Sequence, residues 1–282
     1  MKLTSSIPEL RALRWQDPTL TWGLVPTMGF LHEGHLALVR QARAENDRVA
    51  VTIFVNPAQF APSEDLSTYP RNLERDLALL RAEQVDMVFT PDTPTIYPPD
   101  FQSFITVEKV TQRLEGASRP THFRGVATVV AKLFNLVQPT RAYFGQKDAQ
   151  QTVVIRQMVR DLNFNLEMII GSTVREPDGL ALSSRNQYLS GAERAAATIL
   201  NRALMKVEHA FHQGERRAER LRQTIQQTIA SEPLARLDYA SIADATTLDE
   251  LDTLDRPALA SLAVFIGRTR LIDNIILTTP KL

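Results

Sequence analysis

Apolar runs alternate with amphipathic segments from the start of the chain to residue 170. Runs rich in β-branched and aromatic residues predict strands at residues 20–27, 48–55, 85–89, 142–144 and 166–170. Apolar residues at helical spacing predict helices at residues 7–16, 36–46, 70–83, 127–137 and 148–162. Strands that alternate with helices are typical of a parallel sheet covered on both faces. We therefore predict a Rossmann-like, doubly wound α/β domain over residues 1–174, with an edge strand at residues 101–107.

The pattern changes in residues 175–282. Two charged, alanine-rich helices are predicted at residues 191–213 and 215–231, followed by strands at residues 237–242, 260–266 and 270–277. These elements predict a smaller C-terminal α+β domain. The boundary lies in a segment between Gly171 and Gly179 that reads as a hinge, so we expect the second domain to act as a lid over the active site.

The first polar cluster follows the first predicted strand, where the sequence reads Pro26-Thr27-Met28-Gly29-Phe30-Leu31-His32-Glu33-Gly34-His35. A glycine turn leads from this strand into a helix, and helix N-termini bind phosphates well. Gly34 lets a ligand approach the backbone closely. The glycine patterns of the Rossmann and Walker motifs are absent. Two alternatives stay open: a packed turn with surface histidines, and a zinc site, although zincin histidines are spaced i, i+4 rather than i, i+3.

Three further polar clusters stand at strand ends or at the domain junction. In open α/β sheets, ligands bind beyond the carboxyl ends of the strands. The clusters are Asn56 with Gln59, the segment Gly145-Gln146-Lys147-Asp148-Ala149-Gln150-Gln151, and Leu182-Ser183-Ser184-Arg185-Asn186. Each has a simpler interpretation, because Asn56-Pro57 can merely turn the chain and single Lys or Arg residues are usually solvated.

Composition narrows the functional classes. The 282 residues include 32 Lys or Arg and 32 Asp or Glu, so no basic excess indicates a nucleic-acid partner. There is no cysteine, which excludes disulfides, Cys-bound zinc and a thiol nucleophile. No signal-peptide core or membrane-spanning run is visible, and we expect a cytoplasmic protein.

These clusters, together with His122-Phe123-Arg124-Gly125-Val126, resemble the motifs of the pantoate–β-alanine ligase family. That family lies within the nucleotidyltransferase-like superfamily, whose HxGH signature matches His32-Glu33-Gly34-His35. The similar segments span residues 25 to 190. Leu182-Ser183-Ser184-Arg185-Asn186 resembles the counterpart of the mobile KMSKS loop of related adenylate-forming enzymes.

The resemblance implies an ATP-dependent ligase of pantothenate and coenzyme A biosynthesis. ATP and (R)-pantoate would give a pantoyl-adenylate and pyrophosphate, and β-alanine would then attack the mixed anhydride to give pantothenate and AMP. No protein nucleophile is needed, so catalysis would consist of alignment and charge stabilisation. Mg²⁺ would bridge the ATP phosphates, and a homodimer would be expected, with contacts near Phe101–Val107.

The resemblance also implies roles for individual residues. His35, His32, Lys147 and Arg185 would be catalytic, with His35 favoured as a proton donor, and Asp76 is a weak candidate near the metal. ATP would contact Met28, Gly29, His32, Gly34, His35, Gly145, Gln146, Lys147, Asp148, the Val174 backbone, Leu182, Ser183, Ser184 and Arg185. Pantoate and β-alanine would contact Gln59, Gln151, Asn56, Pro26, Met28, Val126 and Val130.

Three other functions stay open at this point. A transferase that joins a nucleotide to a phosphorylated alcohol would need extra cations, for which Arg71 and Arg124 are candidates. A non-catalytic nucleotide sensor would bind ATP without releasing pyrophosphate. A zinc hydrolase would instead hold stoichiometric zinc.

Overall fold

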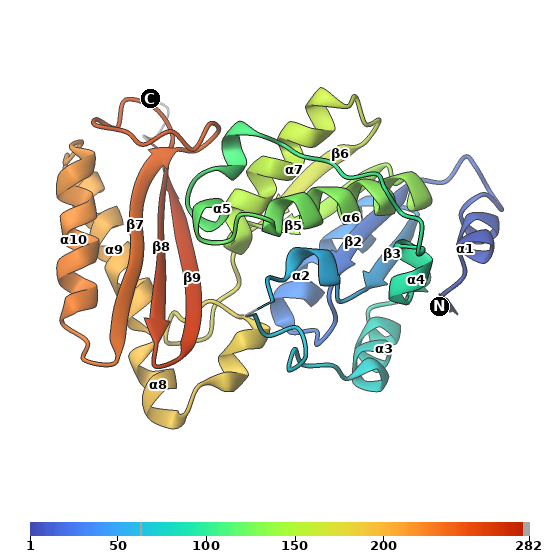
Figure 1. The fold of residues 1–282 in the computed structure, drawn as a ribbon, viewed down its shortest axis with the longest axis horizontal. Helices are drawn as coiled ribbons and strands as arrows, with labels where there is room; N and C mark the ends of the chain where they lie inside the picture. Colours follow the sequence, from blue (N-terminus) through green and yellow to red (C-terminus); the bar gives the residue numbers. More distant parts are fainter. Residues whose placement is uncertain (63, 279–282) are drawn as a thin grey trace. The chain divides into compact units, whose positions relative to one another are not determined.

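The computed structural model describes residues 1–62 and 64–278 (Figure 1). The chain divides into two compact units, which are described separately. The first comprises Met1–Gly145 and Val154–Ser172, and the second comprises Gln146–Val153 and the chain from Thr173 on. The division at Ser172 lies two residues before the predicted boundary. The assignment of Gln146–Val153 to the second unit was not predicted. The last four residues of the predicted second domain lie outside the described residues.

The first unit contains a six-stranded parallel sheet with the order β1-β4-β3-β2-β5-β6. The α/β fold predicted from the alternating pattern is thus confirmed. The chain moves from β2 outward in one direction through β3 and β4, and from β5 outward in the other through β6. The carboxyl ends of β2 and β5 therefore form the switch point at which such sheets bind ligands. The strands are β1 (Lys2–Thr4), β2 (Trp22–Thr27), β3 (Arg48–Ile53), β4 (Met87–Phe89), β5 (Arg141–Gly145) and β6 (Glu167–Gly171).

Helices cover this sheet. A core cluster joins Val25, Val49 and Val51 of the strands to Val39 of α2 and Leu80 of α3, so α2 and α3 pack on one face. The largely buried α6 contacts β2 and α1. The helices are α1 (Ile7–Arg14), α2 (Glu33–Glu45), α3 (Leu73–Ala82), α4 (Thr93–Ile96), α5 (Glu115–Ser118), α6 (His122–Val137) and α7 (Ala149–Asp161), with 3-10 turns η1 (Pro57–Gln59), η2 (Lys109–Thr111) and η3 (Gln146–Asp148).

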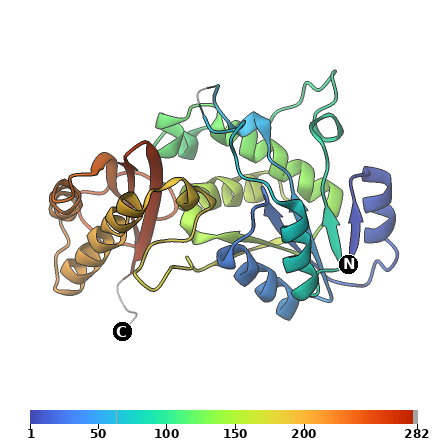
Figure 2. The ribbon, with the colours of Figure 1, turned by 90° about the horizontal axis from the view of Figure 1, so that it is seen from below.

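Two features of the first unit differ from the sequence prediction. Strand β1, dark blue in Figure 2, was missed; it pairs with β4 at the edge of the sheet. The strand predicted at Phe101–Val107 is wrong, because this segment is not paired with any strand. Its aromatic rings instead stack: Phe101 contacts both Tyr97 and Phe104 edge to face, at centroid distances of 5.1 and 5.2 Å. These contacts and a hydrogen bond from the Ile105 N–H to the Thr128 hydroxyl replace a strand ladder.

The second unit contains a three-stranded antiparallel sheet, β7-β8-β9, formed by Ala235–Asp244, Ala258–Ile266 and Thr269–Leu277. Helices α9 (Ile199–His212) and α10 (Ala218–Ala230) cover one face of it (Figure 2). The single helix predicted at residues 191–213 is divided into α8 (Gly191–Ala196) and α9, because the Thr198 hydroxyl bonds the Ala195 carbonyl at the break. The 3-10 turn η4 (Ser184–Tyr188) precedes α8.

Candidate active site

The turn after β2 is shaped by Gly29. Its φ of 82° lies in the left-handed region, and a Cβ there would lie 2.9 Å from the Cγ2 of Ile53. Only glycine fits this position without strain. The turn leads into α2, which begins at Glu33 rather than at the predicted Leu36, so His35 lies in its first turn and His32 is its N-cap.

Asp76 of α3 holds this turn in place. Its side chain is 1% exposed, and its two carboxylate oxygens accept hydrogen bonds from the backbone N–H groups of Phe30 (2.7 Å) and Leu31 (2.8 Å). Arg75 completes the arrangement by donating to the Leu31 carbonyl at 2.9 Å. This geometry gives no support to the predicted metal-ligand role of Asp76. In residues 1–62 and 64–278, no three or more His, Cys, Asp or Glu residues are grouped so as to hold a metal ion.

The two histidines of the turn are oriented by backbone amides. The Nδ1 of His32 accepts a hydrogen bond from the Gly34 N–H, and the Nδ1 of His35 accepts one from the His32 N–H, both at 3.2 Å. A neutral imidazole that accepts at Nδ1 carries its proton on Nε2. The ring centroids are 4.0 Å apart. The turn therefore presents two N–H donors from one end of α2, the end that also favours negative charge.

The turn after β3 holds Gln59 through Asn56. The Gln59 Oε1 accepts from Asn56 Nδ2 at 3.1 Å, and the Gln59 Nε2 lies 3.2 Å from the sulfur of Met28. Asn56 is 1% exposed; its Nδ2 also donates to the Gly125 carbonyl, and its Oδ1 accepts from the Ala58 N–H and from the Tyr97 hydroxyl. All four hydrogen-bonding positions of Asn56 are occupied within the protein. Asn56 thus supports Gln59, and its predicted contact with the substrate stays a prediction.

The carbonyl of Gln59 is held from the other side by His122 and Arg119. His122 Nδ1 donates to it at 2.9 Å, and Arg119 Nη2 donates at 3.3 Å. Burial, together with the charge of Arg119, lowers the pKa of His122 to about 4, so the ring is neutral at pH 7. Arg119 is itself paired with Glu64. Sequence reasoning missed Tyr97 and Arg119, because neither follows a strand directly or belongs to a motif.

The apolar residues predicted to contact pantoate or β-alanine also belong to the first unit. Val126 and Val130 are one turn apart on α6 and are 2% and 5% exposed, whereas Pro26 and Met28 are partly exposed at the end of β2. Helix α6 reaches the turn after β3 only because Gly125 has no side chain. A Cβ at Gly125 would lie 2.2 Å from the Ala58 carbonyl oxygen.

The second unit holds the predicted nucleotide segments. Lys147 lies in η3, and its Nζ is 3.5 Å from the Oδ1 of Asp148; Gln151 lies in the first turn of α7. Gly145 ends β5 at the switch point of the first unit, and a Cβ there would meet no atom within 4 Å. The backbone beside Gly145 is therefore open to a ligand.

A short hairpin links Val174 to the serine-rich segment of the same unit. The Val174 carbonyl accepts from the Leu182 N–H at 3.0 Å, and Arg175 pairs with Ala181. Ser183 then caps η4, because its hydroxyl accepts from the Arg185 N–H at 3.3 Å. The structure thus joins Val174 to Leu182–Arg185 in one local arrangement.

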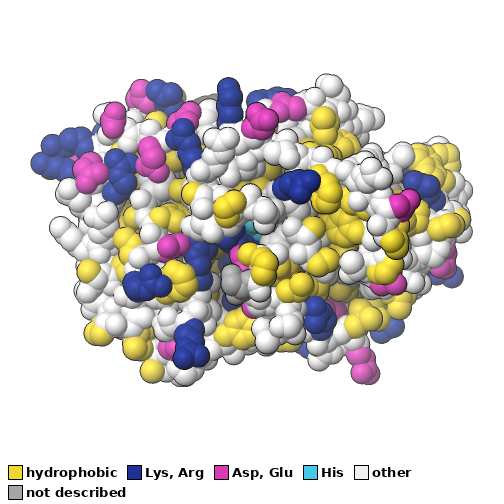
Figure 3. Space-filling model, viewed as in Figure 1, with side chains coloured by type: hydrophobic (Ala, Val, Ile, Leu, Met, Phe, Trp, Pro, Cys, Tyr) yellow, Lys and Arg dark blue, Asp and Glu magenta, His cyan; other side chains and the backbone are white. Residues whose placement is uncertain are grey.

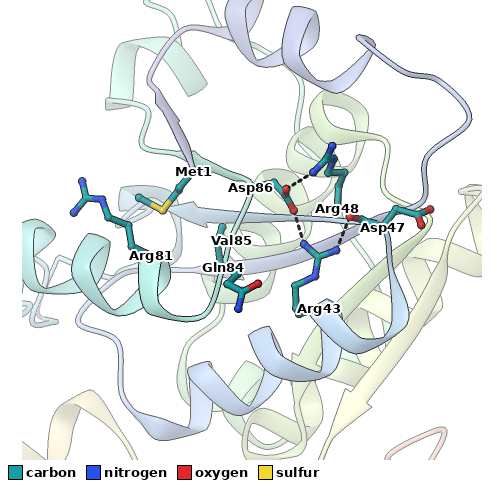
Figure 4. Close-up of a pocket in the computed structure, with 8 residues that line it drawn as sticks. All are labelled: Met1, Arg43, Asp47, Arg48, Arg81, Gln84, Val85 and Asp86. Carbon is teal, nitrogen blue, oxygen red and sulfur yellow. Dashed lines mark hydrogen bonds and ion pairs between the residues drawn. The ribbon is translucent and has the colours of Figure 1, made fainter.

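A separate cavity of about 600 Å³ lies at the opposite, amino-terminal edge of the first sheet (Figure 4). It contains none of the predicted site residues. Arg43 and Arg48, which line it, share the carboxylate of Asp86, at 2.6 and 2.8 Å. On the face shown in Figure 3, basic and acidic side chains are interspersed. Among the described residues, no helix has the length and apolarity to cross a bilayer.

A family model for pantoate–β-alanine ligase matches residues 2–276. The chain belongs to the pantoate–β-alanine ligase family. It is 61% identical over 277 residues to a pantothenate synthetase of Roseiflexus sp. (strain RS-1), covering 98% of this chain and 99% of that protein. A crystal structure of pantothenate synthetase from Thermus thermophilus shares 48% identity with a TM-score of 0.93, covering 98% of this chain and 99% of that one.

A further solved relative is the pantoate–β-alanine ligase of Francisella tularensis, described as complexed with β-γ ATP and β-alanine. It is 35% identical, with a TM-score of 0.79, and the similarity covers 100% of both chains. The expectation of a ligase that joins pantoate to β-alanine is thus confirmed. The transferase, the sensor and the zinc hydrolase receive no support from these relatives.

Proposed function

We propose that this ligase activates pantoate with ATP at the switch point of the first sheet and then passes the pantoyl group to β-alanine. A pantoate carboxylate oxygen attacks the α-phosphorus, the bond to the β-phosphate bridging oxygen breaks, and pyrophosphate leaves. The β-alanine amine then attacks the acyl carbon, loses a proton, and displaces AMP. The observation that carries the proposal is the turn after β2, where backbone amides orient two histidines as Nε2 donors.

Negative charge develops on the α-phosphate and on pyrophosphate during the first step. His32 and His35 supply N–H donors at the start of α2, and we assign the proton-donating role to His35. Lys147 and Arg185 supply positive charge from the second unit. Preorganised donors and charges of this kind are typically the largest single contribution to such catalysis. Mg²⁺ would enter as part of the MgATP substrate and would supply further positive charge to the phosphates.

Pantoate and ATP are assigned to different sets of residues. Gln59, oriented by Asn56, and Gln151 bind pantoate, and Gln59 also meets β-alanine. Four apolar residues face the dimethyl end of pantoate: Pro26, Met28, Val126 and Val130. We assign the ribose to Gly145 and Asp148, near Gln146, and adenine to the Val174 backbone. Leu182, Ser183 and Ser184 in the second unit, and Met28, Gly29 and Gly34 in the first, are each assigned to ATP.

Pyrophosphate release tests the reaction sequence. MgATP with pantoate alone should give release limited to about one per site, because the adenylate stays bound. Adding β-alanine should make release continuous. Equal continuous release in the absence of β-alanine, or none with pantoate, would contradict the proposal.

Lys147→Ala tests the residue assignment. Removing one charge-stabilising donor typically costs a factor of about 100 to 1,000 in rate. We expect that loss in pantoate-dependent pyrophosphate release, with the thermal unfolding temperature unchanged. Lys206→Ala, an exposed lysine on α9, is the matched control and should keep the full rate. Near-normal release by Lys147→Ala would remove Lys147 from the mechanism.

The predicted homodimer, the cytoplasmic location and the lack of a nucleic-acid partner stay predictions. The interspersed charges of Figure 3 support the last of these. Light scattering coupled to size-exclusion chromatography would measure the assembly, with a mass near that of one chain contradicting the dimer.

A further inference from the structure

The backbone around Lys147 is held by a single side chain of β9. Asn274 Nδ2 donates to the carbonyl oxygens of Gln146 (3.1 Å) and Lys147 (2.8 Å), and Asn274 Oδ1 accepts from Gln146 Nε2 at 3.0 Å. Asn274 is 4% exposed. The amide therefore contacts the segment with both its donor and its acceptor atoms, and all of these groups belong to the second unit.

The hydrogen bonds of Asn274 act on the short connection between β5 and α7. The turn η3 has three residues, and short 3-10 turns have poor hydrogen-bond geometry. Gly145, directly before it, has no side chain to pack, and a Cβ there would meet nothing within 4 Å. Strand β9, in contrast, is paired with β8 over its whole length from Thr269 to Leu277. The position of the Lys147 backbone is thus set from β9.

The residue before Asn274 holds the other nucleotide segment of the second unit. Asp273, 2% exposed, binds Arg175 with both oxygens, at 2.6 and 2.9 Å. Arg175 follows Val174 and begins the hairpin that leads to Leu182–Arg185. Two adjacent buried residues of β9 therefore fix both segments with respect to one rigid strand.

We propose that Asn274 is a positioning residue for adenylate formation, which acts by holding the Lys147 backbone in register. This inference rests on the proposed role of Lys147. Asn274 does not touch substrate. Its effect is confined to the position of the lysine, so its loss should slow the step that Lys147 accelerates and leave pantoate binding unchanged.

The test is a double-mutant cycle with Asn274→Ala and Lys147→Ala. Single-turnover pyrophosphate release is measured with MgATP and pantoate in the absence of β-alanine. A displacement of about 1 Å at such a group can cost on the order of 100-fold, and we expect Asn274→Ala to slow release about 10- to 100-fold with the KM for pantoate unchanged. The double variant should be no slower than Lys147→Ala alone, because coupled residues are not additive.

Two further variants separate positioning from folding. Ser261→Ala is the matched control: Ser261 is buried, lies directly opposite Asn274 in the β8–β9 register, and its hydroxyl makes no hydrogen bond within the described chain. It should keep the full rate. Asn274→Asp keeps the side-chain size but loses the hydrogen bonds that Asn274 donates to the Gln146 and Lys147 carbonyls. This variant replaces Asn274→Ala in the test if Asn274→Ala does not fold. We expect Asn274→Asp to be as slow as Asn274→Ala.

The outcomes distinguish this inference from the proposed function. If Lys147→Ala is slow and folded Asn274 variants are fast, the positioning role is overturned and the role of Lys147 stands. Additive effects in the double variant, or a raised KM for pantoate, would also overturn it. If Lys147→Ala keeps the normal rate, the assignment of Lys147 fails, and the positioning role fails with it.

Discussion

The turn that holds Gln59 and the segment that holds Lys147 are built in different ways. Gln59 is fixed by residues from loops and helix starts of its own unit, among them Asn56 at the same turn and His122 at the start of α6. Lys147 is fixed by Asn274, which is 127 positions away in the sequence and lies on β9 of the same unit. A binding group can thus be supported by several loops and helix starts around it or by one residue of a paired strand, and the second arrangement ties Lys147 to the sheet of the second unit.

Removing the Arg175 side chain should cause the largest loss of stability among these variants, and it should disturb the segments held by β9 but not the Gln59 turn. Arg175→Ala leaves the carboxylate of Asp273 buried without its bidentate partner. Breaking such a buried pair typically costs about 3 to 5 kcal/mol. We expect a lower free energy of unfolding in urea and a raised KM for ATP, with the KM for pantoate unchanged. The exposed pair of Arg256 with Asp255 provides the control, because Arg256→Ala should change neither quantity.

Lowering the pH should weaken the Gln59 turn first. The pKa of His122 lies at about 4 in the folded chain, against an ordinary value of 6.5, so the unfolded chain binds the extra proton between these pH values. Stability contributed by His122 is therefore complete above pH 6.5 and is lost as the pH falls toward 4. A pKa difference of this size corresponds to about 3 kcal/mol. Urea unfolding at pH 7 and pH 4.5 measures it.

His122→Asn supplies the comparison for that pH series. The asparagine cannot gain a proton, so its unfolding free energy should fall less between pH 7 and 4.5 than that of the unaltered chain. An identical fall in both proteins would show that other groups dominate the acid sensitivity.

The smallest expected effect comes from Gly125→Ala, which tests the close contact between α6 and the Gln59 turn. The added methyl would lie 2.2 Å from the Ala58 carbonyl oxygen, so the turn must move. Overpacking of this kind costs about 1 to 3 kcal/mol. We expect a raised KM for pantoate with the KM for ATP unchanged. Gly191→Ala is the control, because a Cβ there meets nothing within 4 Å; equal behaviour of the two variants would disprove the argument.

Most strands of the first sheet can be predicted from the sequence because each is marked by residues within it or directly after it. Continuous apolar runs identify β2, β3 and β5, and polar residues directly after these strands identify His32, Gln59 and Lys147 as candidates. The role of a residue depends also on partners from distant parts of the chain. Asn56 follows a strand just as Gln59 does, yet its hydrogen bonds are all used within the protein.

Other features leave no pattern in the sequence. Strand β1 has three residues and forms only because β4 offers an edge. The apolar residues of Phe101–Val107 belong to a chain of edge-to-face ring contacts from Tyr97 through Phe101 to Phe104, and the sequence pattern does not distinguish these contacts from strand pairing. The bond from Asn274 to the Lys147 carbonyl depends on how the chain folds back over 127 positions, and no local pattern contains it.

The open space at Gly145 has a consequence for how natural variation at this position can be interpreted. Gly29 is required by the backbone itself, so its replacement would be selected against through folding alone. Gly145 is not, since a methyl group there would touch no protein atom. With the ribose beside Gly145, as proposed above, substitutions at position 145 would record selection on nucleotide binding separately from selection on the fold.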